Sequence, residues 1–161
     1  MIAAVEGPAV GAGMDMALMC DLRVISETAR FCEAYVKVGL VPGDGGCYFL
    51  PRLVGIARAL ELLWTGRFVE ADEALRIGLA NRLVPAGQAL TEARALAAQL
   101  AAAPPVAIGM IKRATYQSAR VDMRTALNLV SSDMGIVRAT EDSKQAMQSF
   151  KERRTADYQG R

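Results

Sequence analysis

Apolar and polar residues are arranged in two different ways along the chain, and the change divides the sequence into two parts. In the first part, short apolar runs are separated by glycine-rich turns, a pattern typical of buried strands and short helices. In the second part, apolar residues recur every three or four positions over longer stretches, which is typical of amphipathic helices. We therefore expect a mixed α/β region over residues 1–86 and an all-helical region over residues 87–161.

The first part is expected to combine strands with short helices. Runs rich in β-branched and other apolar residues predict strands at residues 2–5, 21–25 and 81–84, and short extended pieces within residues 29–38. Helical composition and closing glycines predict helices at residues 13–20, 47–53, 57–64 and 70–78.

The second part is expected to contain helices at residues 90–102, 105–118, 123–138 and 141–153. Leu127, Val130, Met134 and Val137 recur at helical spacing and form an apolar face that must be buried against something. Two interpretations are equally supported by this pattern. The helices fold back onto the core of their own chain, or they pack against another subunit.

Composition narrows the classes of function. The 161 residues are 52% apolar, enough for one hydrophobic core, and 19 basic against 17 acidic residues give a net charge of +2, which does not favour nucleic acid as a partner. The three cysteines lack the spacing of a disulfide framework or a zinc site, so no metal is expected. Apolar runs are too short for a membrane span, and no secretory signal is recognisable, so we expect a cytoplasmic protein.

The chain contains no histidine. This excludes Ser–His and Cys–His catalytic arrangements and removes the most common proton carrier near neutral pH. Any acid–base chemistry must therefore use carboxylates, tyrosine or bound water, helped by backbone amides.

The most informative motif is the glycine-rich turn Gly11–Ala12–Gly13 between an apolar run and an apolar helix. Small residues let a ligand approach the backbone, and the free N–H groups of a helix start can stabilise developing negative charge. Asp15 follows Ala12 by one helical turn, so an amide donor and a carboxylate share one face. The turn therefore has the outline of an active site.

Four segments together resemble the crotonase, or enoyl-CoA hydratase/isomerase, superfamily. They are IAAVEGPAVGAGMDMALMCDLRV, ARFCEAYVKVGLVPGDGG, LPRLVGIARALELLWTGRFVEADEALRIGLANRLVP and a helical tail ending near MQSFKERR. The resemblance implies a spiral of ββα turns, here partial, followed by a C-terminal helical trimerisation region. It also implies acyl-CoA thioester substrates, no separate cofactor, and assembly into homotrimers or hexamers. One backbone amide of the family's oxyanion hole matches Ala12, whereas the other and much of the CoA pocket belong to an upstream portion that this sequence does not contain.

The resemblance assigns catalytic roles to a few side chains. Asp15 matches the first catalytic glutamate of hydratases, a position where dienoyl-CoA isomerases carry aspartate. Tyr35 matches the second catalytic glutamate, and a phenol there could donate a proton or orient water but would be a poor base. Glu33 lies two residues earlier, so an extended segment would direct both side chains to the same face.

Other positions are expected to contact the substrate. Gly11 and Gly13 flank the oxyanion amide, and Gly43 could offer a backbone N–H. Met134 and Arg153 match positions that contact CoA in hydratases, although Met134 also fits a core position and Arg153 a solvated basic cluster.

Asp44 lies one position beyond an acid of the dienoyl-CoA isomerases. We expect it to bond neighbouring amides in a turn.

These residues favour an enzyme that adds water to a 2-enoyl-CoA. An enoyl- or dienoyl-CoA isomerase is the first alternative, because only Asp15 matches a hydratase carboxylate. A catalytically incompetent scaffold subunit is the second, because one oxyanion donor is missing. A dinucleotide-binding module is the weakest, since Met16 stands where the third glycine of that fingerprint belongs.

Overall fold

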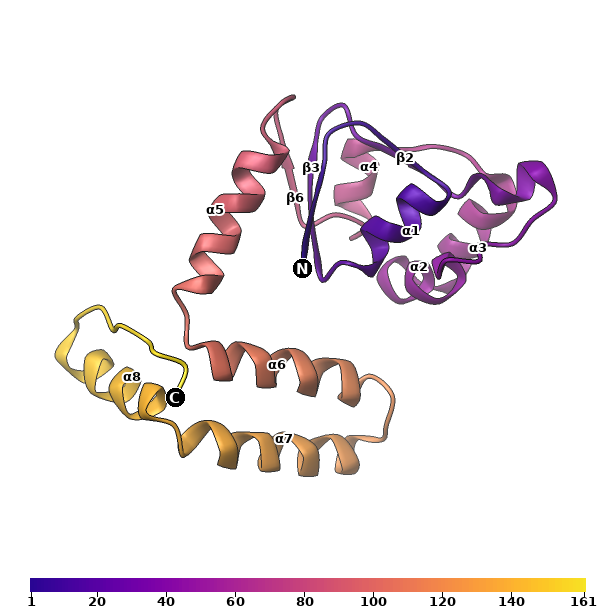
Figure 1. Cartoon of the computed structure of the whole chain (residues 1–161). Helices are drawn as coiled ribbons and strands as arrows, with labels where there is room; N and C mark the ends of the chain where they lie inside the picture. Colours follow the sequence, from indigo (N-terminus) through magenta and orange to yellow (C-terminus); the bar gives the residue numbers. More distant parts are fainter. The chain divides into compact units, whose positions relative to one another are not determined.

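The computed structural model describes all 161 residues, and the chain divides into two units, Met1–Ala97 and Ala98–Arg161 (Figure 1). The first unit contains two three-stranded sheets, with strand orders β1-β3-β6 and β2-β4-β5. The strands are β1 (Ile2–Val5), β2 (Pro8–Val10), β3 (Leu22–Ser26), β4 (Arg30–Cys32), β5 (Val69–Glu70) and β6 (Arg82–Val84). Its helices are α1 (Ala12–Met19), the 3₁₀ helix η1 (Ala34–Val38), α2 (Gly46–Val54), α3 (Ile56–Thr65), α4 (Ala71–Arg76) and most of α5 (Ala89–Ala101).

The first four strands of the chain alternate between the two sheets. β1 pairs in parallel with β3 in one sheet, and β2 pairs in parallel with β4 in the other. The chain therefore adds one strand to each sheet and then a helix, which is the ββα turn that the resemblance implies. The predicted strands at residues 2–5, 21–25 and 81–84 are confirmed as β1, β3 and β6.

This winding brings two distant segments together at the end of the second sheet. Val10 of β2 is in register with Cys32 of β4, and the Gly11 N–H donates to the Cys32 carbonyl at 2.9 Å. Because the strands are parallel, their carboxyl ends meet at the same edge, as in other sheets that carry sites there. The start of α1 and Glu33 are therefore held next to each other.

Two expectations for this region need correction. β2 was not predicted, because Pro8–Val10 is only three residues long and runs directly into the glycine turn. Within residues 29–38, only β4 is extended, and η1 takes up the remainder as a 3₁₀ helix. Tyr35 thus lies on a helical turn. The expectation that Tyr35 and Glu33 share one face of an extended segment is therefore wrong.

The core of the first unit lies between the sheets and helices α1 to α4. Phe31, Leu50, Leu62 and Leu79 have no more than 1% of their surface exposed and belong to one cluster with Met14 of α1. Each such side chain contributes roughly 1.5–3 kcal/mol to stability through its removal from water. The site helix α1 is thus fixed by well-packed apolar contacts.

Arg23 is a buried cation that ties β3 to neighbouring loops. Only 2% of its surface is exposed, and its guanidinium donates to the carbonyls of Leu79 at 2.6 Å, Cys20 at 2.7 Å and Ala17 at 3.3 Å. The Cys20 carbonyl lies just beyond α1, and the Ala17 carbonyl, which already accepts from the Cys20 N–H at 3.3 Å, gains a second donor. These bonds hold the C-terminal end of α1 in place.

The boundary between the units lies inside α5, later than the expected boundary between residues 86 and 87. The Glu6 carboxylate accepts hydrogen bonds from the Gly87 N–H at 3.0 Å and the Ala89 N–H at 2.6 Å. Arg82 of β6 pairs with Glu92 of α5 at 2.5 Å. These contacts attach the start of α5 to the first unit, which the sequence periodicity alone does not reveal.

The second unit is a helical hairpin followed by a third helix. α6 (Pro105–Ser118) and α7 (Met123–Arg138) run antiparallel side by side, and α8 (Glu141–Glu152) follows (Figure 1). The predicted bounds of α6 and α7 are confirmed. Asp122 caps α7, and Thr140 caps α8 through the Ser143 N–H.

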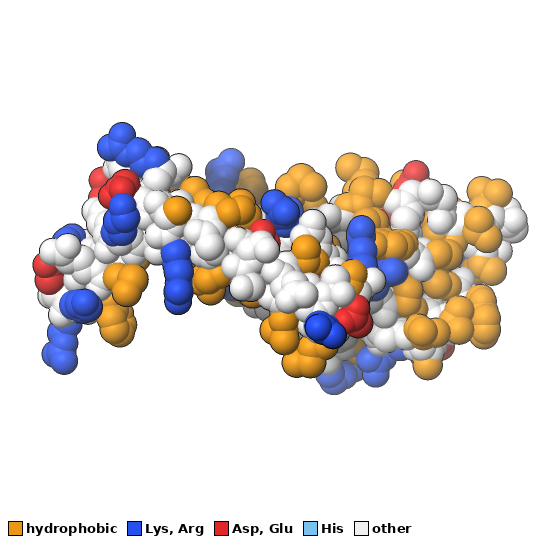
Figure 2. All heavy atoms as spheres, turned by 90° about the horizontal axis from the view of Figure 1, so that it is seen from below, with side chains coloured by type: hydrophobic (Ala, Val, Ile, Leu, Met, Phe, Trp, Pro, Cys, Tyr) orange, Lys and Arg blue, Asp and Glu red, His pale blue; other side chains and the backbone are white.

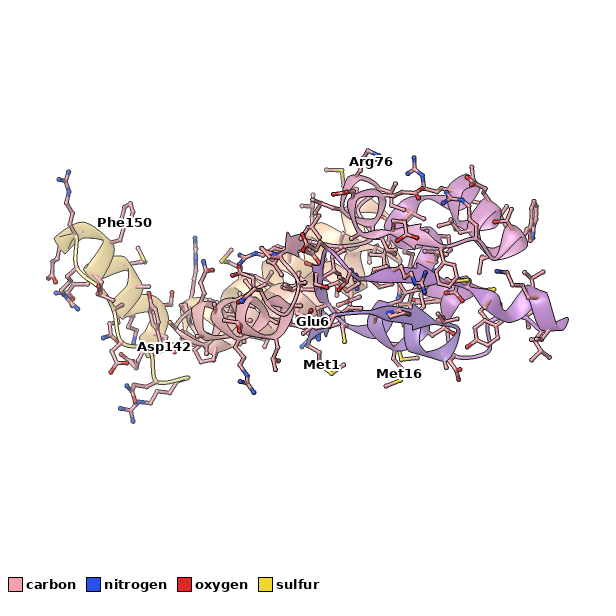
Figure 3. All side chains as sticks on the ribbon, turned by 90° about the horizontal axis from the view of Figure 1, so that it is seen from above. Met1, Glu6, Met16, Arg76, Asp142 and Phe150 are labelled. Carbon is pink, nitrogen blue, oxygen red and sulfur yellow. The ribbon has the colours of Figure 1, made fainter.

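The helices of this unit bury few apolar side chains. No residue of α6 is buried, and the buried residues of α7 and α8 are the polar Asp133, Asp142 and Ser149. Phe150 is 86% exposed and extends freely from α8 (Figure 3). Figure 2 shows hydrophobic side chains, drawn in orange, on the surface of the protein. The expectation that Met134 fits a core position is wrong, because 48% of its surface is exposed.

The length and apolar character of the helices can be compared with what a membrane span requires. None of them is by itself both long and apolar enough to cross a bilayer, and only the bent pair α5 and α6 meets the length and composition criteria together.

Candidate active site

The site is built around the start of α1. Gly11 precedes the helix with a positive φ of 53°, a conformation that favours glycine. Ala12 is the first residue of the helix, and its φ is not positive. The strain of the turn therefore falls on Gly11, and alanine fits the central position of the motif. The Ala12 N–H belongs to the first helical turn and donates to no protein acceptor, so it is available to a ligand.

Asp15 points into the protein from the same helical turn. Its side chain is completely buried, whereas the following residue, Met16, is 67% exposed and extends outward (Figure 3). One oxygen, Oδ2, accepts a hydrogen bond from the Tyr35 hydroxyl at 2.9 Å, and the other, Oδ1, lies on the side of the Glu33 carboxyl group. A buried carboxylate beside a second buried acid is costly unless the pair has a function, so Asp15 is a candidate catalytic group.

Glu33 lies opposite Asp15 at the end of β4. Only 1% of its surface is exposed, and its carboxyl group, when protonated, donates a hydrogen bond to Asp15. Burial raises the pKa of Glu33 to about 8, and the negative charge of Asp15 adds to this effect. Glu33 therefore carries a proton near neutral pH.

Gly46, the first residue of α2, fixes the spacing of these two carboxyl groups. A Cβ atom at this position would lie 2.5 Å from Asp15 Oδ1 and 2.6 Å from Glu33 Oε1. Since both oxygens lie within 2.6 Å of one point, they are no more than about 5 Å apart. The absent side chain leaves room for both carboxyl groups, and a hydrogen bond joins them when Glu33 is protonated.

Tyr35 and Asp44 extend the cluster toward the surface. The Tyr35 hydroxyl is 2.9 Å from Asp15 Oδ2 and 3.1 Å from Asp44 Oδ2. Burial, followed by hydrogen bonds to these two carboxylates, raises the pKa of Tyr35, so the phenol stays protonated. The expectation that Asp44 bonds neighbouring amides in a turn is wrong, because its side chain contacts the Tyr35 hydroxyl instead.

The remaining predicted residues lie in different places. Gly13 is in the first turn of α1, and Gly43 is exposed in the loop before α2; added Cβ atoms at both positions would meet nothing within 4 Å. Met134 and Arg153 belong to the second unit, where Met134 lines a hollow of about 230 Å³ between α6 and α7, and Arg153 ends α8 with φ 54°. The structure therefore unites Ala12, Asp15, Glu33 and Tyr35.

The sequence does not reveal two features of this cluster. Gly46 is one, although the Gly45–Gly46 pair signals a constrained helix start. The contact of Asp44 with Tyr35 is the other, because it depends on how η1 and the loop fold against each other, and spacing does not encode that.

Comparison with known proteins identifies the family. The sequence profile described as "Enoyl-CoA hydratase/isomerase" matches residues 1–161. The chain belongs to the enoyl-CoA hydratase/isomerase family.

Individual members of this family are similar in sequence and in structure. A short-chain-enoyl-CoA hydratase from Clostridium acetobutylicum is 41% identical over 154 residues, which are 96% of this chain and 59% of that protein. A short-chain-enoyl-CoA hydratase from Clostridioides difficile is 39% identical over 94% of this chain and 97% of that protein. The crystal structure of an enoyl-CoA hydratase from Mycobacterium tuberculosis superimposes with a TM-score of 0.96 at 36% identity, over 99% of this chain and 64% of that one.

These matches support the α/β crotonase-like fold, and their coverage shows how much of each relative's length this chain spans. The chain spans about 59% of the length of the Clostridium acetobutylicum hydratase.

Proposed function

We propose that the protein acts on acyl-CoA thioesters and that its leading reaction is the addition of water to a 2-enoyl-CoA. The observation that carries the proposal is the buried pair of Asp15 and Glu33, with the proton on Glu33, one helical turn from the unpartnered Ala12 N–H. Paired carboxyl groups in environments that separate their protonation states are typical of acid–base catalysis. The named relatives are enoyl-CoA hydratases, which agrees with this chemistry.

In the proposed reaction, the Ala12 N–H donates to the thioester oxygen and stabilises the enolate that forms there. Asp15 takes a proton from water as the water oxygen bonds to Cβ of the substrate. Glu33 gives its proton to Cα. Transfer of the new proton from Asp15 to Glu33 then restores the starting state, so that one water has been added and no proton is gained or lost.

Isomerisation of a 3-enoyl-CoA is the second candidate, because Tyr35 stands where a hydratase is expected to have a carboxylate. A hydroxyl that already donates to Asp15 holds water less well than a second carboxylate would. In this reaction, Asp15 removes a proton from Cα and returns it to Cγ, and the same Ala12 N–H stabilises the intermediate enolate.

Assays of the purified protein with crotonyl-CoA and with a 3-enoyl-CoA separate these candidates. Asp15→Asn should abolish the observed reaction while leaving the fold intact, because the amide keeps the shape of the carboxylate but cannot accept the proton. Binding of acyl-CoA without turnover of either substrate would refute the enzymatic proposal and favour the scaffold alternative.

We also propose that the protein self-associates through the second unit, as a homotrimer or hexamer. α6, α7 and α8 bury no apolar side chain, and Met123, Leu127 and Phe150 are at least 58% exposed. Exposed apolar surface of this kind usually marks an interaction site. Sedimentation equilibrium of the protein tests this proposal, and a monomer at all concentrations would contradict it.

A further inference from the structure

Three acidic or phenolic groups form a line from the buried site to the surface. Asp15 is completely buried, Tyr35 is half-buried and Asp44 is exposed. The Tyr35 oxygen lies 2.9 Å from one carboxylate and 3.1 Å from the other, so both distances are those of hydrogen bonds. Each group comes from a different element: α1, η1 and the loop before α2.

The number of protons on these three groups decides which of the two contacts is a hydrogen bond. A phenol has one O–H and can donate to only one of two carboxylates at a time. The second contact becomes a hydrogen bond only when that carboxyl group is itself protonated and donates to the phenol oxygen. The line therefore accommodates two arrangements, with the extra proton on Asp44 or on Asp15, and the phenol remains neutral in both.

We propose that Tyr35 and Asp44 form a proton route that connects the buried Asp15 carboxylate with solvent. Asp44, protonated from water, passes its proton to the Tyr35 oxygen as Tyr35 passes its own proton to Asp15. One O–H bond forms and one breaks at the phenol, and the negative charge moves from Asp15 to Asp44. Reversal of the transfer discharges a proton from Asp15 to water.

The remaining neighbour of Asp15 offers no such connection. Glu33 is 1% exposed and its hydrogen bond is to Asp15 itself, so it exchanges protons with Asp15 but does not lead to the surface. Tyr35 and Asp44 are thus positioning residues that act through Asp15. The inference rests on the proposed function, in which Asp15 receives a proton during turnover.

The route can be measured by following a proton that Asp15 removes from substrate. Isomerisation of a 3-enoyl-CoA is run in D₂O, and the deuterium content of the product at Cγ is measured by mass spectrometry. With the route intact, the substrate proton on Asp15 exchanges with solvent before it is returned, so the product contains deuterium. Tyr35→Phe breaks the route, and we expect conversion to continue with loss of deuterium from that position.

Two further variants sharpen this test. Asp44→Asn should also lower the deuterium content, because the surface end of the route can no longer carry a proton. Tyr116→Phe, on α6 and outside the site, is the matched control and should leave the deuterium content unchanged. Equal deuterium content in the unsubstituted protein and in Tyr35→Phe would overturn the route while leaving the proposed function in place.

A second measurement does not depend on turnover. The infrared band of the protonated Glu33 carboxyl group, identified by its loss in Glu33→Gln, shifts when its proton is replaced by deuterium. After rapid mixing into D₂O, we expect this shift to be slower in Tyr35→Phe than in the unsubstituted protein, because the Glu33 proton exchanges through Asp15. Identical exchange rates would overturn the route even if neither enoyl-CoA is converted, whereas absence of conversion alone would refute only the proposed function.

Discussion

Replacing Gly46 with alanine tests the geometry of the acid pair directly. The added methyl carbon would lie 2.5 Å from Asp15 Oδ1, 2.6 Å from Glu33 Oε1 and 2.9 Å from Pro42 Cβ. To reach an ordinary contact of 3.4 Å, each carboxyl oxygen must move by about 0.8–0.9 Å. The two acids must therefore change position relative to each other and to the Ala12 N–H.

The expected effect on activity is larger than the effect on stability. Overpacking a buried site costs about 1–3 kcal/mol, while alanine is favoured over glycine in a helix by about 1 kcal/mol, so a net loss of about 1 kcal/mol is expected. Displacement of catalytic groups by nearly 1 Å typically lowers turnover by about 100-fold. Urea denaturation measures the first quantity, and turnover of crotonyl-CoA or a 3-enoyl-CoA measures the second.

Two alanine variants at open positions serve as controls. An added Cβ at Gly13 or at Gly109 would meet nothing within 4 Å, so both variants should fold at least as stably as the unsubstituted chain. Gly109→Ala, on α6, should also keep full activity. Full activity in Gly46→Ala would refute the reasoning, because it would mean that the chemistry does not depend on the spacing of Asp15 and Glu33.

Three further predictions follow from burial and charge. The pKa of Glu33 is about 8 in the folded protein and 4.5 when unperturbed, so the folded state retains the Glu33 proton between these pH values. The free energy of unfolding should therefore fall as pH rises through this window, by up to about 1.4 kcal/mol per pH unit. Denaturation curves of Glu33→Gln should lack this slope, and a parallel pH dependence in both proteins would argue against a buried neutral acid. Arg23→Met should destabilise the first unit by roughly 2 kcal/mol or more in urea denaturation, since it removes the guanidinium that donates to the carbonyls of Cys20 and Leu79. A change within error would show that other groups satisfy these carbonyls. Leu127→Glu should weaken self-association in sedimentation experiments without unfolding α7, because this side chain is 58% exposed; unchanged association would exclude that face of α7 from the interface.

Much of the fold could be predicted because its signals are local. The β-branched run at residues 2–5 and the proline at the start of α6 define element bounds that the structure reproduces. β2 was missed because three residues before a glycine turn provide no periodicity. Residues 29–38 predict short extended pieces, whereas η1 forms a 3₁₀ helix that ends at Gly39 in a left-handed conformation with φ 70°.

The site was only partly predictable for a different reason. Ala12 and Asp15 lie within one helical turn, so their proximity follows from sequence spacing. The pairing of Asp15 with Glu33 depends on the register of β2 with β4, and the Tyr35–Asp44 contact depends on packing between η1 and a loop. Such contacts between distant segments have no periodic signature in the sequence. The cytoplasmic location and the substrate contacts of Met134 and Arg153 stay predictions.

The central claim is that the Ala12 amide binds the oxygen of a thioester beside two carboxyl groups that exchange protons. A crystal structure of the protein with a non-reactive acyl-CoA analogue measures this most directly. The account predicts a distance of about 2.7–3.1 Å between the Ala12 nitrogen and the thioester oxygen, with the acyl Cα facing Asp15 and Glu33. An analogue bound with its carbonyl away from α1, or an Ala12 N–H occupied by a protein acceptor in the complex, would contradict it.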